Sequence, residues 1–248
     1  MAPSHVFDAH PLVQKLESIF ALADDEKAAI LSMPMQVATL RADQDVVRVG
    51  DSPSRSCIIL EGMTATYVST SKGRRQIVSF GIMGDTPDLQ SLLLEEMDNS
   101  LSTLTPCTLG FVQHAVLRDV CTRFPRIAAA LWRSTLVDAA IFRAWMTSIG
   151  QREGYSRMAH LFCELVARKR AVGLVEEDRC AFPITQTELA DALGMTAVHV
   201  NRVLQALRSD GHIVLDQGWL TVPDWDRLVA VADFDATYLH VKENRPAA

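Results

Sequence analysis

The sequence predicts an α+β fold with three successive parts: an amino-terminal β-roll, a long central helix, and a carboxy-terminal unit of short helices and a β-hairpin. Two observations support this prediction. Short apolar and β-branched runs fill residues 37–112, with glycines between them at roughly ten-residue spacing. About 25 residues without glycine or proline then follow Pro125, as far as Gly150.

The amino-terminal part begins with helices. Across residues 1–33, apolar side chains such as Leu12, Leu16 and Ile19 recur every three to four positions, and Asp24-Asp25-Glu26 opens a second helical segment. Strands are expected next, and the glycines between them provide the turns of a small antiparallel roll. The expected strands are residues 45–49, 57–60, 64–68, 76–80 and 108–112.

The central helix begins at Pro125, a residue suited to the first helical position, and reaches Gly150. Its apolar residues cover so much of its circumference that two faces must be buried. The roll covers one face, so we expect the helix of a second copy to cover the other; burial wholly within one chain is the alternative. The residues expected at this dimer interface are Leu131, Ile141, Phe142, Trp145 and Ile149.

The most informative segment follows a short extended stretch at residues 179–184. Thr185-Gln-Thr-Glu188 has the spacing of a capping box and so begins a short helix. Gly194-Met-Thr196 makes a tight turn, and Thr196 caps a second helix that runs to about Ser209. The second helix has an apolar inner face and a polar outer face. Two short helices joined in this way predict a helix-turn-helix.

A β-hairpin is expected after the two helices, with strands at 211–215 and 219–222 around Asp216-Gln-Gly218. The unit is therefore a winged helix-turn-helix, whose second helix enters the major groove of DNA. Val198 is suited to a thymine methyl group, Asn201 to adenine, and Arg202 to guanine or a phosphate. The expected DNA-binding residues are Thr185, Gln186, Thr187, Thr196, Ala197, Val198, His199, Asn201, Arg202, Gln205 and Arg208.

Together these features resemble the Crp/Fnr superfamily of bacterial transcription regulators. The resemblance rests on the glycines of the roll (Gly50-Asp51, Gly62, Gly73, Gly84-Asp85), the long helix, and the runs at 156–165 and 185–202. It extends over about residues 10–240. It implies a cyclic-nucleotide-binding-like jelly roll, a homodimer joined through the central helix, a palindromic promoter site in double-stranded DNA, and RNA polymerase as a partner.

This organisation divides the chain into three expected parts. Residues 1–124 form the effector domain, residues 125–150 form the dimerisation helix and hinge, and residues 151–248 form the winged helix-turn-helix domain. The boundary near residue 150 is expected because Gly150-Gln-Arg-Glu-Gly154 is a hinge-like break.

The sequence departs from the pattern of members that bind cyclic AMP. Asp88-Leu89 stands where those members have Gly-Glu, and the following loop, with Glu95, Glu96 and Asp98, contains no arginine. A phosphate diester needs a cationic or N–H-rich site, which acidic side chains oppose. Cyclic AMP is therefore not the expected effector, and the sequence names no other. Arg74 and Arg75 follow a turn glycine and are expected to be solvated.

No cofactor or metal is expected. The five cysteines form no C-x-x-C pair and none precedes Cys57, so the cluster of amino-terminal cysteines used for iron–sulfur sensing is absent. Cys107 and His114 are candidate haem ligands by residue type alone, without a spacing signature. Catalytic motifs such as G-x-S-x-G, the P-loop and H-E-x-x-H are also absent, so an enzyme is not expected.

Charge and hydropathy set the remaining limits. The net charge is −6, so DNA binding must come from a placed motif and not from bulk charge. The sequence contains no apolar run long enough for a membrane span and no expected signal peptide, which favours a cytoplasmic protein. The alternative function is a signalling or ligand-binding subunit whose winged helix contacts protein instead of DNA.

Overall fold

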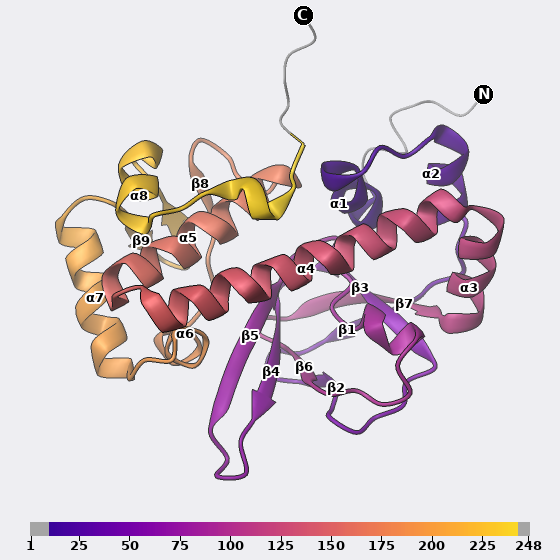
Figure 1. The fold of residues 1–248 in the computed structure, drawn as a ribbon, viewed down its shortest axis with the longest axis horizontal. Coiled ribbons are helices and arrows are strands. Elements are labelled where there is room, and N and C mark those ends of the chain that lie inside the picture. The colour runs from indigo at the N-terminus through magenta and orange to yellow at the C-terminus, as the bar shows by residue number, and fades with distance from the viewer. Residues whose placement is uncertain (1–9, 243–248) are drawn as a thin grey trace, which may run out of the picture. The chain divides into compact units, whose positions relative to one another are not determined.

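The computed structural model describes residues 10–242 (Figure 1). Contacts divide these residues into two compact units: residues 10–68, 80–139 and 240–242 form the first, and residues 69–79 and 140–239 form the second. The ends of the first and third predicted domains, at residues 1–9 and 243–248, lie outside the described residues. The division between the units falls inside the long helix, whereas the sequence placed boundaries on either side of it.

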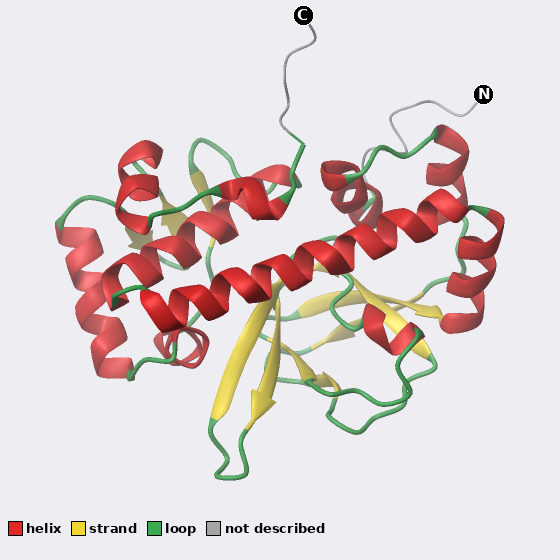
Figure 2. Cartoon of the chain, in the orientation of Figure 1, coloured by secondary structure: helices red, strands yellow, loops and turns green. Residues whose placement is uncertain are grey.

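The roll consists of two antiparallel sheets (Figure 2). One has the strand order β1-β7-β3, and the other has the order β2-β6-β4-β5. The five expected strands are present, and β1 and β6 are additional. The bounds are β1 (Gln36–Leu40), β2 (Asp45–Val47), β3 (Arg55–Glu61), β4 (Thr64–Ser69), β5 (Arg75–Gly81), β6 (Ser100–Thr103) and β7 (Cys107–Gln113).

Side-chain alternation along β3 divides the core of the first unit into two layers. Cys57 and Ile59 point into the roll, where they pack with Leu101 and Leu109. Ile58 points to the opposite face and packs against the helices. Those helices are α1 (Pro11–Ile19), α2 (Asp24–Leu31), α3 (His114–Arg123) and the start of α4 (Pro125–Gln151).

The long helix α4 begins at Pro125 as predicted, and passes Gly150 to end at Gln151. Its first half belongs to the core of the first unit, through Ile127, Ala130 and Leu131. The break that follows is short, because α5 (Gly154–Ala171) starts three residues later. The Arg157 guanidinium donates to the carbonyls of Ser148, Ile149 and Arg152, which satisfies the exposed end of α4.

The second unit is a winged helix-turn-helix followed by helices that the sequence did not predict. The three short strands pair in the order β8-β10-β9. Its elements after α5 are β8 (Arg179–Ala181), α6 (Gln186–Leu193), α7 (Ala197–Ser209), β9 (Val214–Asp216), β10 (Trp219–Thr221), α8 (Trp225–Ala232) and the 3-10 turn η3 (Ala236–Leu239). Among the described residues, no helix has both the length and the apolar character that crossing a bilayer requires.

Candidate DNA-binding surface

The start of α6 is fixed by the predicted capping box. The Glu188 N–H donates to Thr185 Oγ1 over 3.2 Å, and the Thr185 N–H donates to Glu188 Oε2 over 2.6 Å. These two bonds satisfy donors that a helix leaves free at its first turn. The helix ends at Gly194, whose φ of +63° is the left-handed conformation that glycine adopts most readily. The turn therefore directs α7 across α6.

Helix α7 has the two faces that the sequence predicted. Thr196 caps it by accepting from the His199 N–H over 3.2 Å. On the inner face, Val200 and Leu207 are fully buried, with Val203 and Leu204 beside them. On the outer face, Val198 is 82% exposed. The outer face is thus free to meet a partner.

The structure places most of the predicted DNA-binding residues on that outer face or at the start of α6. His199 and Asn201 are half-buried, and the other nine are exposed: Thr185, Gln186, Thr187, Thr196, Ala197, Val198, Arg202, Gln205 and Arg208. The His199 ring lies against the start of α5, where a Cβ atom built on Gly154 would be 2.8 Å from its Nε2. This packing explains the partial burial of His199.

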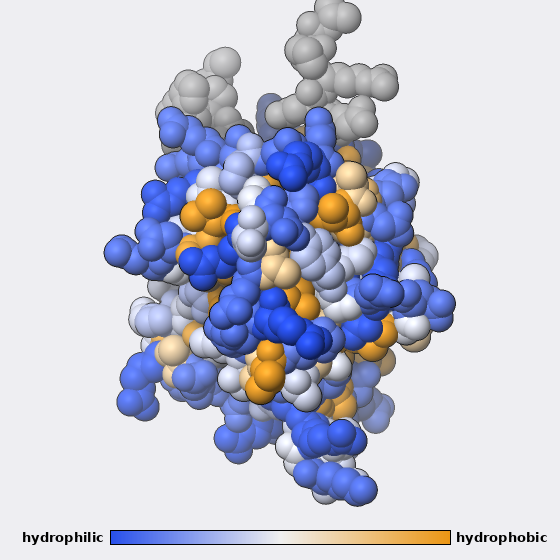
Figure 3. Space-filling model, turned by 90° about the vertical axis from the view of Figure 1, so that its left-hand side faces the viewer, coloured by the Kyte–Doolittle hydropathy of each residue, from blue (hydrophilic) through white to orange (hydrophobic). Residues whose placement is uncertain are grey.

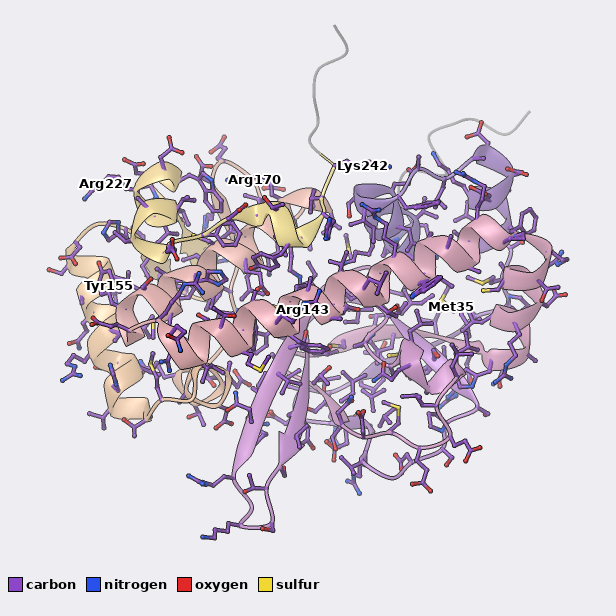
Figure 4. The ribbon with its side chains drawn as sticks, viewed as in Figure 1. Met35, Arg143, Tyr155, Arg170, Arg227 and Lys242 are labelled. Carbon is purple, nitrogen blue, oxygen red and sulfur yellow. The ribbon has the colours of Figure 1, made fainter. Side chains whose placement is uncertain are left out.

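Several contacts hold α7 in its place. Tyr155, at the start of α5, donates its hydroxyl to Asp210 just beyond the end of α7, over 2.7 Å (Figure 4). Asn201 Nδ2 donates to Gln186 Oε1 over 3.2 Å and so connects α7 to α6. The residues that the sequence grouped by spacing are therefore neighbours in space, across two helices.

The wing is the predicted hairpin of β9 and β10. Gln217 and Gly218 both have positive φ values, +46° and +80°, as the two central residues of a type I′ turn require. The Arg179 guanidinium stacks over the Trp219 ring, 4.4 Å from its centroid. This contact joins β8 to β10 at the exposed side of the wing.

Arg75 and Gln76, on β5, belong to the second unit and bond to α6. The Arg75 Nε lies 2.8 Å from Asp191 Oδ2 on α6, and the Gln76 amide donates to the Ala192 carbonyl over 3.1 Å. Arg75 is therefore only partly solvated, whereas Arg74 is exposed as expected. The sequence gave no indication of the ion pair between Arg75 and Asp191, because these residues are 116 positions apart.

Comparisons with known proteins agree with this architecture. A family model for the cyclic nucleotide-binding domain matches residues 37–124, and one for the Crp-like helix-turn-helix domain matches residues 156–231. The chain is 25% identical to the transcriptional activator protein FnrL of Cereibacter sphaeroides over 226 residues, which cover 88% of this chain and 89% of FnrL. The chain belongs to the Crp/Fnr superfamily.

A solved structure supports the same fold. The likeness to FixK2 from Bradyrhizobium japonicum has a TM-score of 0.72 at 20% identity, and it covers 80% of this chain and 98% of FixK2. The relatives also include the nitrogen fixation regulation protein FixK of Azorhizobium caulinodans, 23% identical over 158 residues, which are 64% of this chain and 63% of that protein. The protein is accordingly a DNA-binding transcription regulator.

The central helix of this Crp/Fnr regulator differs in detail from the sequence prediction. Leu131, Ile141 and Trp145 are buried within their own chain, so they offer no surface to a partner. Phe142 and Ile149 are exposed, and their place at a dimer interface stays a prediction. Three other apolar side chains of α4 are also exposed: Trp132 at 69%, Leu136 at 55% and Met146 at 69%. Arg143, labelled in Figure 4, is exposed as well.

The buried Trp145 takes part in a polar network. Its Nε1–H donates to Glu164 Oε2 over 2.9 Å, and the Tyr238 hydroxyl donates to the same oxygen over 2.9 Å. The Arg168 guanidinium lies 3.4 Å from the other carboxylate oxygen. Burial raises the pKa of Glu164 and lowers the pKa of the neighbouring His160, which stacks on Tyr238, to about 4. The network connects α4, α5 and η3.

The space next to the turn at Gly84 in the roll is filled by residues of α1. Gly84 has a φ of +90°, and a Cβ atom there would lie 2.7 Å from the Lys15 Cβ, so α1 packs directly on this turn. The Lys15 Nζ forms a buried ion pair with Asp85 Oδ1 at 2.7 Å. The Asp88 carboxylate turns inward and accepts from the Cys57 N–H over 2.8 Å, and burial raises its pKa to about 6.

The two candidate haem ligands, His114 and Cys107, are likewise held within the fold. The His114 Nε2 lies 3.1 Å from the hydroxyls of both Ser56 and Ser91, and all three side chains are buried. Cys107 is a buried free thiol. Among residues 10–242, no three histidine, cysteine, aspartate or glutamate side chains are grouped as a metal ion would need.

Figure 3 shows the end of the second unit, where hydrophilic surface predominates around separate apolar patches.

Proposed function

We propose that this regulator binds a palindromic promoter site as a homodimer, with α7 of each copy in the major groove, and that cyclic AMP is not its effector. The observation that carries the proposal is the outer face of α7, where Val198, Asn201 and Arg202 lie together on a helix that is capped and buttressed from α5 and α6. Promoter DNA is in the bacterial cytoplasm, so that is where the protein acts.

A gel-shift experiment tests this proposal. A labelled fragment from the region upstream of the protein's own gene is expected to be retarded, and excess unlabelled random DNA should compete only weakly. The alternative, a signalling subunit whose winged helix contacts protein, predicts no sequence-specific retardation. RNA polymerase is proposed as a partner because FnrL is named as a transcriptional activator.

The proposed dimer interface is the exposed apolar side of α4. Trp132, Leu136 and Met146 are large and more than half exposed. They are 4 and 10 residues apart, which is close to one and three times the 3.5-residue repeat of a paired-helix seam. Phe142 and Ile149 border this stripe. A two-fold arrangement would place the same residues from both copies against one another. Such apolar side chains would then be removed from water by the partner helix.

The two exposed arginines of α7 should differ in their roles. We expect Arg202→Ala to cost about 1–3 kcal/mol on the specific site and to relax the preference at one base pair per half-site, because a bidentate base contact is lost. Arg208→Ala at the far end should weaken all sequences alike and reduce the salt dependence. Titrations of specific and random DNA at several salt concentrations measure both. Equal weakening of both DNAs by Arg202→Ala would show that Arg202 does not read a base.

Cyclic AMP is expected to give no measurable heat in calorimetry at sub-millimolar concentration. The expected phosphate position is opposed by the exposed carboxylates of Glu95, Glu96 and Asp98, with no lysine or arginine between Gly84 and residue 101. An analogue without the phosphate, adenosine, is the matched control. Saturable micromolar binding of cyclic AMP alone would contradict the prediction and would place the phosphate elsewhere in the roll.

A further inference from the structure

Two side chains of the DNA-binding surface, one on each helix of the helix-turn-helix, are joined by a hydrogen bond. Asn201 Nδ2 on α7 donates to Oε1 of Gln186, the first residue of α6, over 3.2 Å. Gln186 is exposed and Asn201 is half-buried. The bond therefore links the helix that enters the major groove to the helix that crosses the DNA backbone.

The chemistry of an asparagine amide gives this bond a consequence. The amide offers one carbonyl oxygen and two N–H protons. Pairing with adenine uses the oxygen, which accepts from N6, and the proton on the same edge, which donates to N7. The second proton points away from that edge. An amide turned over would set its oxygen against the N7 acceptor, so a fixed partner for the second proton selects the productive orientation.

We propose that Gln186 is a positioning residue that holds the Asn201 amide in the orientation that reads adenine. The inference rests on the proposed function, since Asn201 must face a base. The Gln186 amide nitrogen is at the same time a donor suited to a phosphate oxygen at the start of α6. One side chain would thus couple the position of the DNA backbone to the reading of one base.

Two neighbouring residues do not compete with Gln186 for the Asn201 amide. The carboxylate in the first turn of α6, that of Glu188, is already bonded to the Thr185 N–H and hydroxyl. Val198, which lies one turn before Asn201 on α7, has no polar group that could compete for the amide. A glutamine at position 186 supplies an acceptor for Asn201 without adding a negative charge next to the phosphates.

The test measures binding of the full-length protein to four operators that differ only at the expected adenine. The unaltered protein should prefer adenine by roughly 5-fold to 150-fold. Gln186→Ala should reduce that preference to less than about 3-fold at this position and leave the other positions unchanged. Gln186→Glu keeps the acceptor, so it should keep the preference while weakening binding to all four operators through repulsion from the phosphates.

Controls separate a positioning role from a structural one. Alanine favours helix, and glutamate is favourable in a first helical turn, so both variants should unfold at close to the temperature of the unaltered protein. Asn201→Ala should abolish the same preference, and Gln186→Ala should add nothing to it.

Three results would overturn the inference. If Gln186→Ala weakens all four operators equally and keeps the preference, Gln186 is only a phosphate contact. If Asn201→Ala keeps the preference, Asn201 is not the reader and Gln186 has nothing to position, although specific binding still supports the proposed function. If the unaltered protein shows no specific binding at all, the proposed function fails and this inference fails with it.

Discussion

Replacing Glu164 by alanine is expected to lower the free energy of unfolding of the second unit by about 3–5 kcal/mol, because it removes one partner of a buried ion pair. The Glu164 side chain is fully buried and faces the Arg168 guanidinium, whose side chain is only 5% exposed. The same substitution removes the acceptor for the Trp145 indole N–H and the Tyr238 hydroxyl. The buried indole N–H then loses a hydrogen bond that water cannot replace, and the half-buried Tyr238 hydroxyl loses its acceptor.

Urea denaturation followed by circular dichroism measures this effect. Glu153→Ala is the matched control, because the Glu153 carboxylate is exposed and makes no capping bond to α5, and it should change the free energy by less than about 0.5 kcal/mol. Glu164→Gln, which keeps an acceptor oxygen, should fall between the two. A Glu164→Ala variant as stable as the control would show that the network contributes nothing to the fold.

Leu136→Glu is expected to convert the protein from a dimer to a monomer and to weaken binding to the palindromic site by at least about 100-fold. Two-fold symmetry brings the substitution into the interface twice, so two unpaired carboxylates would be buried together. A monomer also loses the gain from engaging two linked half-sites, which is commonly 10²–10⁴. Light scattering measures the mass, and a gel shift measures binding.

The control is Leu136→Met, which keeps an apolar side chain of similar volume and should remain dimeric. A single half-site should bind the Leu136→Glu variant and the unaltered protein with similar affinity, because α7 lies in a different part of the chain. If Leu136→Glu stays dimeric at micromolar concentration, the exposed side of α4 is not the interface.

Local signals explain what the sequence predicted well. The capping box of Thr185 and Glu188, the turn at Gly194 and the cap at Thr196 each act within four residues, so they could be recognised without knowing the fold. The same holds for the type I′ turn of the wing. The expected strands of the roll were likewise marked by apolar runs between glycines, and the structure contains all five.

Long-range partners explain what the sequence did not reveal. Ser100, Ser102 and Thr103 are buried on strand β6. The Thr103 hydroxyl donates a hydrogen bond to the carbonyl of Arg41, 62 positions away in the sequence. No apolar alternation marked that strand. On α4 the apolar residues were recognised, but Trp145 faces inward, where its indole N–H donates to Glu164 on α5, a partner that the sequence did not reveal. Which side of an apolar helix stays exposed depends on such partners.

Selection of bound oligonucleotides from a random pool tests the central claim most directly. The protein should be purified from its native host, so that any bound effector is retained. We predict a two-fold symmetric consensus whose half-sites are centred roughly 10 base pairs apart, with an adenine in each half-site that is lost in Asn201→Ala. A consensus without two-fold symmetry, or a pool in which no sequence is enriched, would contradict the account.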